Sequence, residues 1–106
     1  MLSEMTYHAF EQRKNRFAYI TDTVGFGNPV ASMPSKTDNT SIRTLTDTGV
    51  IIVTNKYTNK IITAFIATTS QALTVYKTDK NGARLPNALM SKIRYNQDLI
   101  DLQPLN

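Results

Sequence analysis

Cysteine is absent from the 106 residues of this chain. Without a thiol there is no disulfide framework, no zinc site built on thiolates and no cysteine nucleophile. Long apolar runs are also missing, because no stretch approaches the roughly 18 consecutive apolar residues of a membrane-spanning helix. Charged residues near the N-terminus come before any apolar run that could serve as a signal peptide. We therefore expect a soluble, cytoplasmic protein without a signal peptide and without membrane association.

Histidine occurs only once, at His8, and the eight acidic residues are scattered along the chain. A metal site built on side chains needs clustered His, Cys, Asp or Glu, and glycosidase or two-metal chemistry needs paired carboxylates. We therefore expect no metal and no cofactor. The Gly-x-Ser-x-Gly motif of serine hydrolases is missing as well.

The residue types that remain for chemistry are His, Tyr, Lys and Arg. A metal-independent ribonuclease can work with this set. It needs a base to activate the ribose 2′-hydroxyl, cations to stabilise the phosphorane-like charge, and an acid for the leaving 5′-oxygen.

Positive charge moderately exceeds negative charge. The chain has 12 Lys and Arg residues, a formal net charge of +4 and a sequence pI near 9.5. This balance favours an anionic partner such as RNA, although no block of like charges forms a basic tail. A hydrophobic fraction of 41% is ordinary for a globular protein. We expect residues 1–106 to form a single domain with one modest core.

Residues 4–18 have the pattern of an amphipathic helix. His8, Gln12 and Arg16 recur at every fourth position and so form a polar stripe along about 12 Å of helix. Arg13 projects away from His8. The side expected to face the core carries Tyr7, Phe10, Phe17 and Ala18.

The rest of the chain predicts an antiparallel sheet followed by a helix. Residues 19–41 contain two glycines and two prolines and are expected to form a long connection, with a short element near residues 30–33. Pro86 opens a helix through about residue 96, and residues 99–102 form a final segment. The predicted strands, rich in Ile, Val, Thr and Tyr, are 42–47, 50–55, 61–68 and 73–77.

These elements predict an α+β fold. We expect an N-terminal helix packed on a three- to four-stranded antiparallel sheet, with a C-terminal helix. The apolar residues on both faces of residues 50–53 indicate that the central strands are covered on each side.

Two segments resemble a known superfamily. Residues 7–16 are similar to the His-Ala-x-x-x-Arg-x-x-x-Arg helix of small bacterial and phage toxin-like proteins. Residues 46–54 lead through a hairpin into Ile61-Ile62-Thr63-Ala64-Phe65, and this pair of segments resembles the core of the barnase/EndoU/colicin/RelE-like (BECR) ribonuclease superfamily. The resemblance implies a small phage-type or toxin-type member, with an N-terminal helix packed on an antiparallel sheet and a strand that contributes a Thr to the site.

The resemblance implies three catalytic residues. His8 would act as base or acid, Arg16 would bind phosphate, and Thr63 would orient the substrate by a hydrogen bond. Because a second His is missing, a binding protein on the same fold is an alternative. The expected substrate-binding residues are Gln12, Arg13, Lys56, Tyr57 and Lys60.

The leading hypothesis is a metal-independent ribonuclease from a phage or mobile element. One alternative is a non-enzymatic phage accessory protein that binds and inhibits a host factor, for which the long polar connection is equally suitable. Another is a nucleic-acid-binding module. In the ordinary structural interpretation, the same residues are a solvated histidine, packed strand residues and charged hairpin tips.

Overall fold

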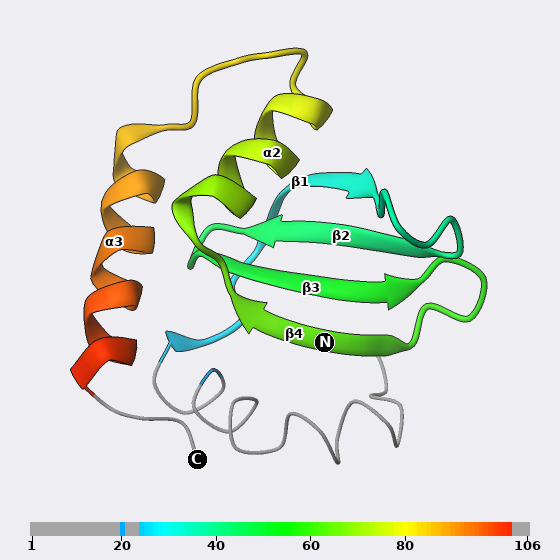
Figure 1. Ribbon diagram of the computed structural model, residues 1–106, viewed down its shortest axis with the longest axis horizontal. Coiled ribbons are helices and arrows are strands. Elements are labelled where there is room, and N and C mark those ends of the chain that lie inside the picture. Colours follow the sequence, from blue (N-terminus) through cyan, green and yellow to red (C-terminus); the bar gives the residue numbers. More distant parts are fainter. Residues whose placement is uncertain (1–19, 21–23, 103–106) are drawn as a thin grey trace.

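The computed structural model describes residue 20 and residues 24–102, and it shows an α+β fold (Figure 1). A four-stranded antiparallel sheet comes first and two helices follow. The predicted helix at residues 4–18 lies outside the described residues. The elements are β1 (Pro29–Pro34), β2 (Ser41–Thr46), β3 (Val50–Asn55), β4 (Ile61–Ile66), α2 (Thr69–Asp79) and α3 (Asn87–Leu102).

The strands form a meander in the order β1-β2-β3-β4, each antiparallel to its neighbour. The predicted strands at 42–47 and 50–55 are confirmed to within a residue, and the predicted strand 61–68 ends earlier, at Ile66. The turn from β2 to β3 needs Gly49, which has φ +86° and donates its backbone N–H to the carbonyl of Thr46 (3.1 Å). Glycine is favoured at such a positive φ because it has no Cβ.

The first strand corrects our prediction of a long connection over residues 19–41. The short element expected near residues 30–33 is β1, an edge strand paired along its length with β2. Proline stands at both of its ends, which an edge strand tolerates because one side of its backbone has no strand to pair with. Burial alternates along this strand, because Ala31 and Met33 are buried while Ser32 and Pro34 are exposed. The pattern is difficult to recognise in the sequence because proline and serine are not typical strand residues.

The predicted strand at residues 73–77 is wrong, because these residues lie within α2. The helix begins at a capping box, in which Thr68 accepts a hydrogen bond from the backbone N–H of Gln71 while the Gln71 side chain accepts one from the backbone N–H of Thr68. Ala72 and Val75, three residues apart, are both buried against the sheet. The β-branched residues at 73–77 favour a strand. The N-cap and the burial of this face stabilise a helix instead.

The predicted C-terminal helix is confirmed and is longer than expected. It runs as α3 from Asn87 to Leu102, so that residues 99–102 continue it rather than forming a separate segment. Pro86 precedes the helix, and its carbonyl accepts a hydrogen bond from the backbone N–H of Met90 (3.0 Å). No helix in the described part of the chain is long and apolar enough to cross a membrane.

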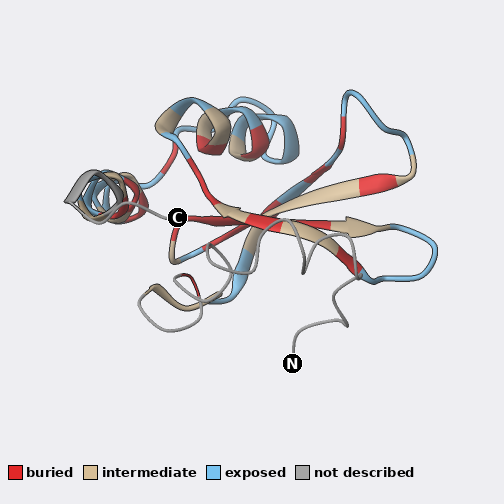
Figure 2. Ribbon diagram, turned by 60° about the horizontal axis from the view of Figure 1, so that its bottom comes forward, coloured by how far each residue is buried: buried red, intermediate tan, exposed pale blue. Residues whose placement is uncertain are grey.

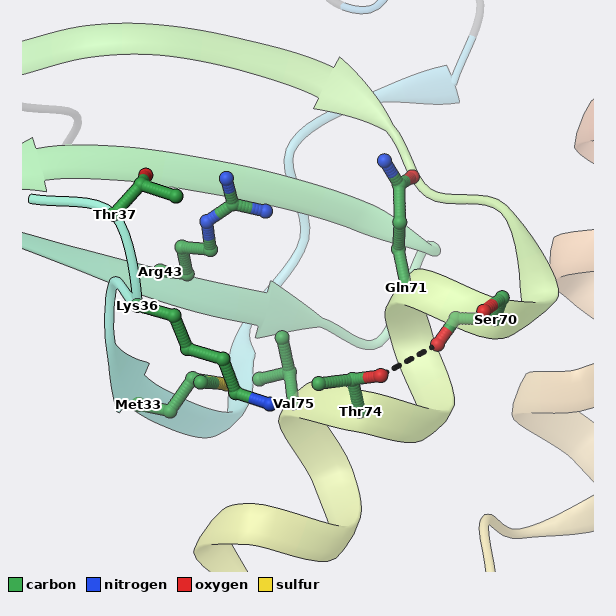
Figure 3. Close-up of a pocket in the computed structure, with 8 residues that line it drawn as sticks. All are labelled: Met33, Lys36, Thr37, Arg43, Ser70, Gln71, Thr74 and Val75. Atoms are coloured by element: carbon green, nitrogen blue, oxygen red, sulfur yellow. Dashed lines mark hydrogen bonds between the residues drawn. The ribbon is translucent and has the colours of Figure 1, made fainter.

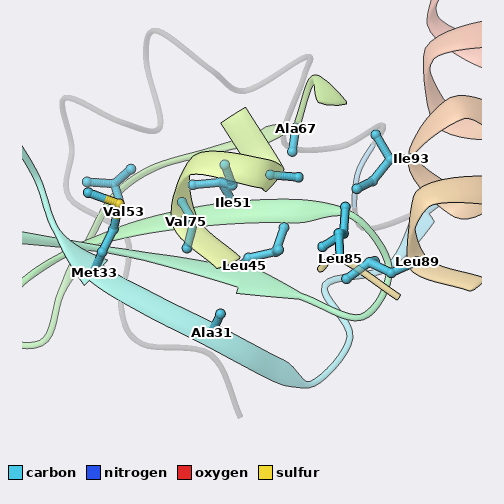
Figure 4. Packing of buried hydrophobic residues seen from close by; sticks show 11 residues of the cluster. Ala31, Met33, Leu45, Ile51, Val53, Ala67, Val75, Leu85, Leu89 and Ile93 are labelled. Carbon is cyan, nitrogen blue, oxygen red and sulfur yellow. The ribbon is translucent and has the colours of Figure 1, made fainter. Parts of the chain in front are cut away.

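Apolar residues pack on both faces of the sheet, as predicted for the central strands. The face under α2 carries the larger cluster (Figures 2 and 4), which includes Leu45, Ile51, Val75 and Ile93. The opposite face carries a smaller one, made of Ile20, Val50, Ala64 and Ile66. Burying a large aliphatic side chain contributes about 1.5–3 kcal/mol. The larger cluster therefore fixes the position of α2 over β1 and β2, where the candidate site lies.

Candidate binding site at one end of the sheet

Two loops lie side by side at one end of the sheet, where β1 and β3 end and β2 and β4 begin (Figure 1). They are residues 35–40 and residues 56–60, together called the loop end below. The backbone N–H of Lys56 donates a hydrogen bond to the carbonyl of Thr40 at 2.9 Å and so connects them. The two loops therefore form one surface.

The loop of residues 56–60 has a conformation fixed by Asn55. The Asn55 side-chain oxygen accepts hydrogen bonds from the backbone N–H groups of Tyr57 (2.9 Å) and Thr58 (3.0 Å). The backbone N–H of Asn59, whose φ is +60°, donates to the carbonyl of Asn55 at 2.7 Å. Asn tolerates this left-handed conformation better than most residues. The turn therefore fixes the backbone that carries the exposed Tyr57 side chain.

Tyr57 is the most exposed large apolar side chain among the described residues, with 74% of its surface accessible. The ammonium group of Lys56 lies 5.2 Å from the centroid of its ring, which is within cation–π range. A cation over one ring face leaves the other face open to a planar group. This arrangement is suited to stacking a nucleobase.

The loop end is basic. It carries Lys36, Lys56 and Lys60, and its one acidic residue is Asp38. The Asp38 carboxylate accepts hydrogen bonds from the backbone N–H (2.9 Å) and the hydroxyl (2.6 Å) of Thr40. These bonds to the Thr40 hydroxyl and N–H lower the pKa of Asp38, so the carboxylate is engaged within its own loop at neutral pH.

A row of residues crosses the sheet beside this end, on the face under α2. Met33 pairs with Arg43, Arg43 with Val53, and Val53 with Thr63. Directly opposed residues of antiparallel strands share a face, and Met33 and Val53 belong to the cluster under α2. Arg43 and Thr63 therefore lie on one face, with their Cα atoms about 10 Å apart across the intervening strand.

A cleft of about 250 Å³ lies between this row, the first turns of α2 and the loop of residues 35–40 (Figure 3). Arg43 projects into it from the sheet and Lys36 from the loop. The guanidinium of Arg43 lies 6.0 Å from the centroid of the Phe65 ring. We call this space the Arg43 cleft. Its lining residues are Met33, Lys36, Thr37, Arg43, Ser70, Gln71, Thr74 and Val75.

The cleft combines positive charge with hydroxyl and amide groups. None of its lining residues is acidic, and within the described residues neither Lys36 nor Arg43 forms an ion pair. Thr74 donates its hydroxyl to the carbonyl of Ser70 at 3.0 Å. Gln71 accepts the backbone N–H of Thr68 on its Oε1, so its Nε2 end can donate to a ligand. Such a lining is suited to an anion.

The structure places four of the eight residues predicted from the sequence. Lys56, Tyr57 and Lys60 lie together at the loop end, and Thr63 lies on β4 in the row with Arg43. The other four, His8, Gln12, Arg13 and Arg16, lie outside the described residues.

The sequence analysis did not include Lys36 and Arg43, which line the cleft. A signal for Arg43 was present, because it is the lone charged residue of the strand Ser41–Thr46. The cleft around that charge depends on α2, part of which was predicted as a strand at residues 73–77. Lys36 gave no signal beyond its place in a polar loop.

Among residues 20 and 24–102, no group of three or more His, Cys, Asp or Glu side chains could hold a metal ion. In comparisons with known proteins, no family model, no curated protein and no solved structure matches the chain.

Proposed function

We propose that this protein binds single-stranded RNA, with a base stacked on Tyr57 and the sugar–phosphate backbone along the lysines of the loop end. The observation that carries this proposal is the exposed ring of Tyr57 beside Lys56, on a turn whose backbone is fixed by Asn55. Base–aromatic stacking together with backbone cations is the usual means of binding single strands. The net charge of +4 supports the same class of partner.

The proposal predicts a particular dependence on salt. Each phosphate neutralised by a Lys or Arg releases counterions, and for single strands the logarithm of the affinity falls with the logarithm of the salt concentration by roughly 0.7 per contact. Titrating a labelled oligouridylate at several salt concentrations should give a slope of about two, as expected for the three lysines of the loop end. An affinity independent of salt, or no binding at low salt, would contradict the proposal.

A rival proposal is that the loop end binds a host protein and the chain acts as a phage accessory inhibitor. The exposed ring of Tyr57 suits a protein interface as well, because Tyr is enriched there. Capture of one stoichiometric host protein, resistant to nuclease and lost with Tyr57→Ala, would favour this rival over RNA.

A second candidate function is metal-independent cleavage of the bound RNA. It is favoured by Thr63 and Arg43 on one face of the sheet, where a cation and a hydroxyl side chain lie in one row. The acid or base would be His8, and Arg16 would assist in binding phosphate, as the resemblance implies. A small BECR-type protein of phage or mobile-element origin, acting in the cytoplasm of a bacterial host cell, is the corresponding assignment.

Cleavage is tested by incubating the purified protein with total RNA in EDTA. The expected products carry a 2′,3′-cyclic phosphate, and their formation should be abolished by His8→Ala. Cleavage that persists in His8→Ala would remove His8 from the mechanism. Binding without any cleavage would leave the protein as a nucleic-acid-binding module.

A further inference from the structure

We propose that the Arg43 cleft binds a phosphomonoester, namely the terminal phosphate of an RNA strand whose bases lie at the loop end. That the phosphate belongs to RNA rests on the function proposed above. That the cleft takes a phosphomonoester rests on the charge of its lining.

The charge of the cleft matches a dianion. Lys36 and Arg43 enter it from different elements, a loop and a strand, and neither is neutralised by an acid of the described residues. The first turn of α2, which forms one wall, also has no acidic residue. A phosphodiester within a strand carries one negative charge, whereas a monoester carries about 1.5 to 2 at neutral pH. Two cations without an acidic partner among the described residues, both lining one small cleft, therefore favour the monoester.

The cleft is bounded by the sheet, by α2 and by the loop of residues 35–40 (Figure 3). The sheet residues Met33 and Arg43 form its floor, Val75 and the first turns of α2 form one wall, and the loop of residues 35–40 forms another (Figure 3).

The cleft and the stacking residue are connected through the loops. Lys36 belongs to the same loop as Thr40, and the Thr40 carbonyl accepts the backbone N–H of Lys56, which is adjacent to Tyr57. An RNA strand with a base stacked on Tyr57 would therefore lie on the same surface as Lys36, which lines the Arg43 cleft. Tyr57 and the Arg43 cleft together would recognise the end of a short single-stranded RNA.

The test compares unlabelled oligouridylates bearing a 5′-phosphate, a 3′-phosphate or hydroxyls at both ends, as competitors of a labelled oligouridylate in fluorescence anisotropy. We expect one of the phosphorylated strands to compete at least about tenfold more strongly than the hydroxyl-ended strand, since hydrogen bonds to charged groups are the stronger ones. The preference should disappear in Arg43→Gln and in Lys36→Gln. Lys36 is exposed, so its variant tests the cleft even if Arg43→Gln impairs folding.

The matched control is Arg94→Gln, which removes an exposed arginine from α3, outside the lining of the cleft. It should keep the full preference for the phosphorylated strand. Equal competition by all three strands, or a preference that survives both cleft variants, would overturn the proposal.

A titration with inorganic phosphate separates the cleft from RNA binding. It should shift the backbone amide resonances of Arg43 and Ser70 in the NMR spectrum, more strongly than chloride at equal ionic strength, and this response should be lost in Lys36→Gln. If no oligonucleotide binds but phosphate gives this response, the RNA function fails and the phosphate site stands. If phosphate leaves these resonances unchanged, the cleft is not a phosphate site, whatever the oligonucleotides do.

Discussion

The backbone N–H of Lys56 and the carbonyl of Thr40, 16 residues apart in sequence, are hydrogen-bonded at 2.9 Å. This bond joins the β1–β2 and β3–β4 loops, which the meander brings to the same end of the sheet. It places the loop that carries the exposed Tyr57 next to a lysine-bearing loop that also borders the Arg43 cleft. The candidate site therefore depends on pairing between strands that are distant in sequence.

Replacing Tyr57 with Ala should weaken RNA binding about tenfold, because stacking of one base is worth roughly 1–3 kcal/mol. Tyr57→Phe should retain most of the affinity. Stability should change little, since the ring is exposed. Fluorescence anisotropy measures the affinity and thermal unfolding measures the stability. The matched control is Tyr95→Ala on α3, where an exposed Tyr also has a lysine, Lys92, 5.4 Å from its ring centroid. An equal loss in both variants would show that the loop end has no special role.

Replacing Thr68 with Ala should destabilise the protein by about 1 kcal/mol, because it removes the N-cap of α2 and half of its capping box. Thr68→Ser keeps the hydroxyl and should restore most of the stability. Urea unfolding provides the measurement. Thr78→Ala, an exposed Thr→Ala change in the last turn of the same helix, should have little effect. A loss as large in Thr78→Ala would mean that the cap is not the cause.

Replacing Gly49 with Ala should be considerably more destabilising than replacing Gly82 with Ala. Both glycines have positive φ, +86° and +84°, so both substitutions strain the backbone by about 1 kcal/mol. A Cβ at Gly49 would in addition lie 2.8 Å from Nδ2 of the buried Asn96 and 3.1 Å from Cγ1 of Ile93, whereas a Cβ at Gly82 meets open space. The difference in unfolding free energy between the two variants measures this contact. Equal losses would show that α3 can shift away from the turn without cost.

The Asp38 carboxyl should titrate below the ordinary range for Asp, because hydrogen bonds from the Thr40 hydroxyl and backbone N–H lower its pKa. A lowered pKa in the folded state means that the carboxylate stabilises the protein above the ordinary pKa, near 3.9, and that this contribution is lost as the pH falls through the folded-state pKa. Thr40→Val removes the hydroxyl and should raise the Asp38 pKa toward the ordinary value. An NMR titration of the Asp38 side chain checks this, and an unchanged midpoint in Thr40→Val would rule out the hydroxyl as the cause.

The sequence by itself determined the fold class, three of the four strands and the C-terminal helix. Segments such as residues 50–55 are rich in β-branched residues and bounded by turn signals, so their local preference agrees with the final structure. It also determined that Lys56, Tyr57 and Lys60 lie on one hairpin, because residues 56–60 are short enough to join antiparallel neighbours. The RNase assignment of His8, Arg16 and Thr63 stays a prediction from resemblance.

Only the tertiary structure decided the state of residues 73–77 and of β1. In α2, burial of Ala72 and Val75 against the sheet outweighs the strand propensity of the segment, and in β1 the pairing with β2 makes a strand of residues with weak preference. The Arg43 cleft exists because of these two outcomes, since α2 forms its wall and Met33 of β1 part of its floor. Local sequence cannot encode such a site, because its residues meet only when the core under α2 has packed.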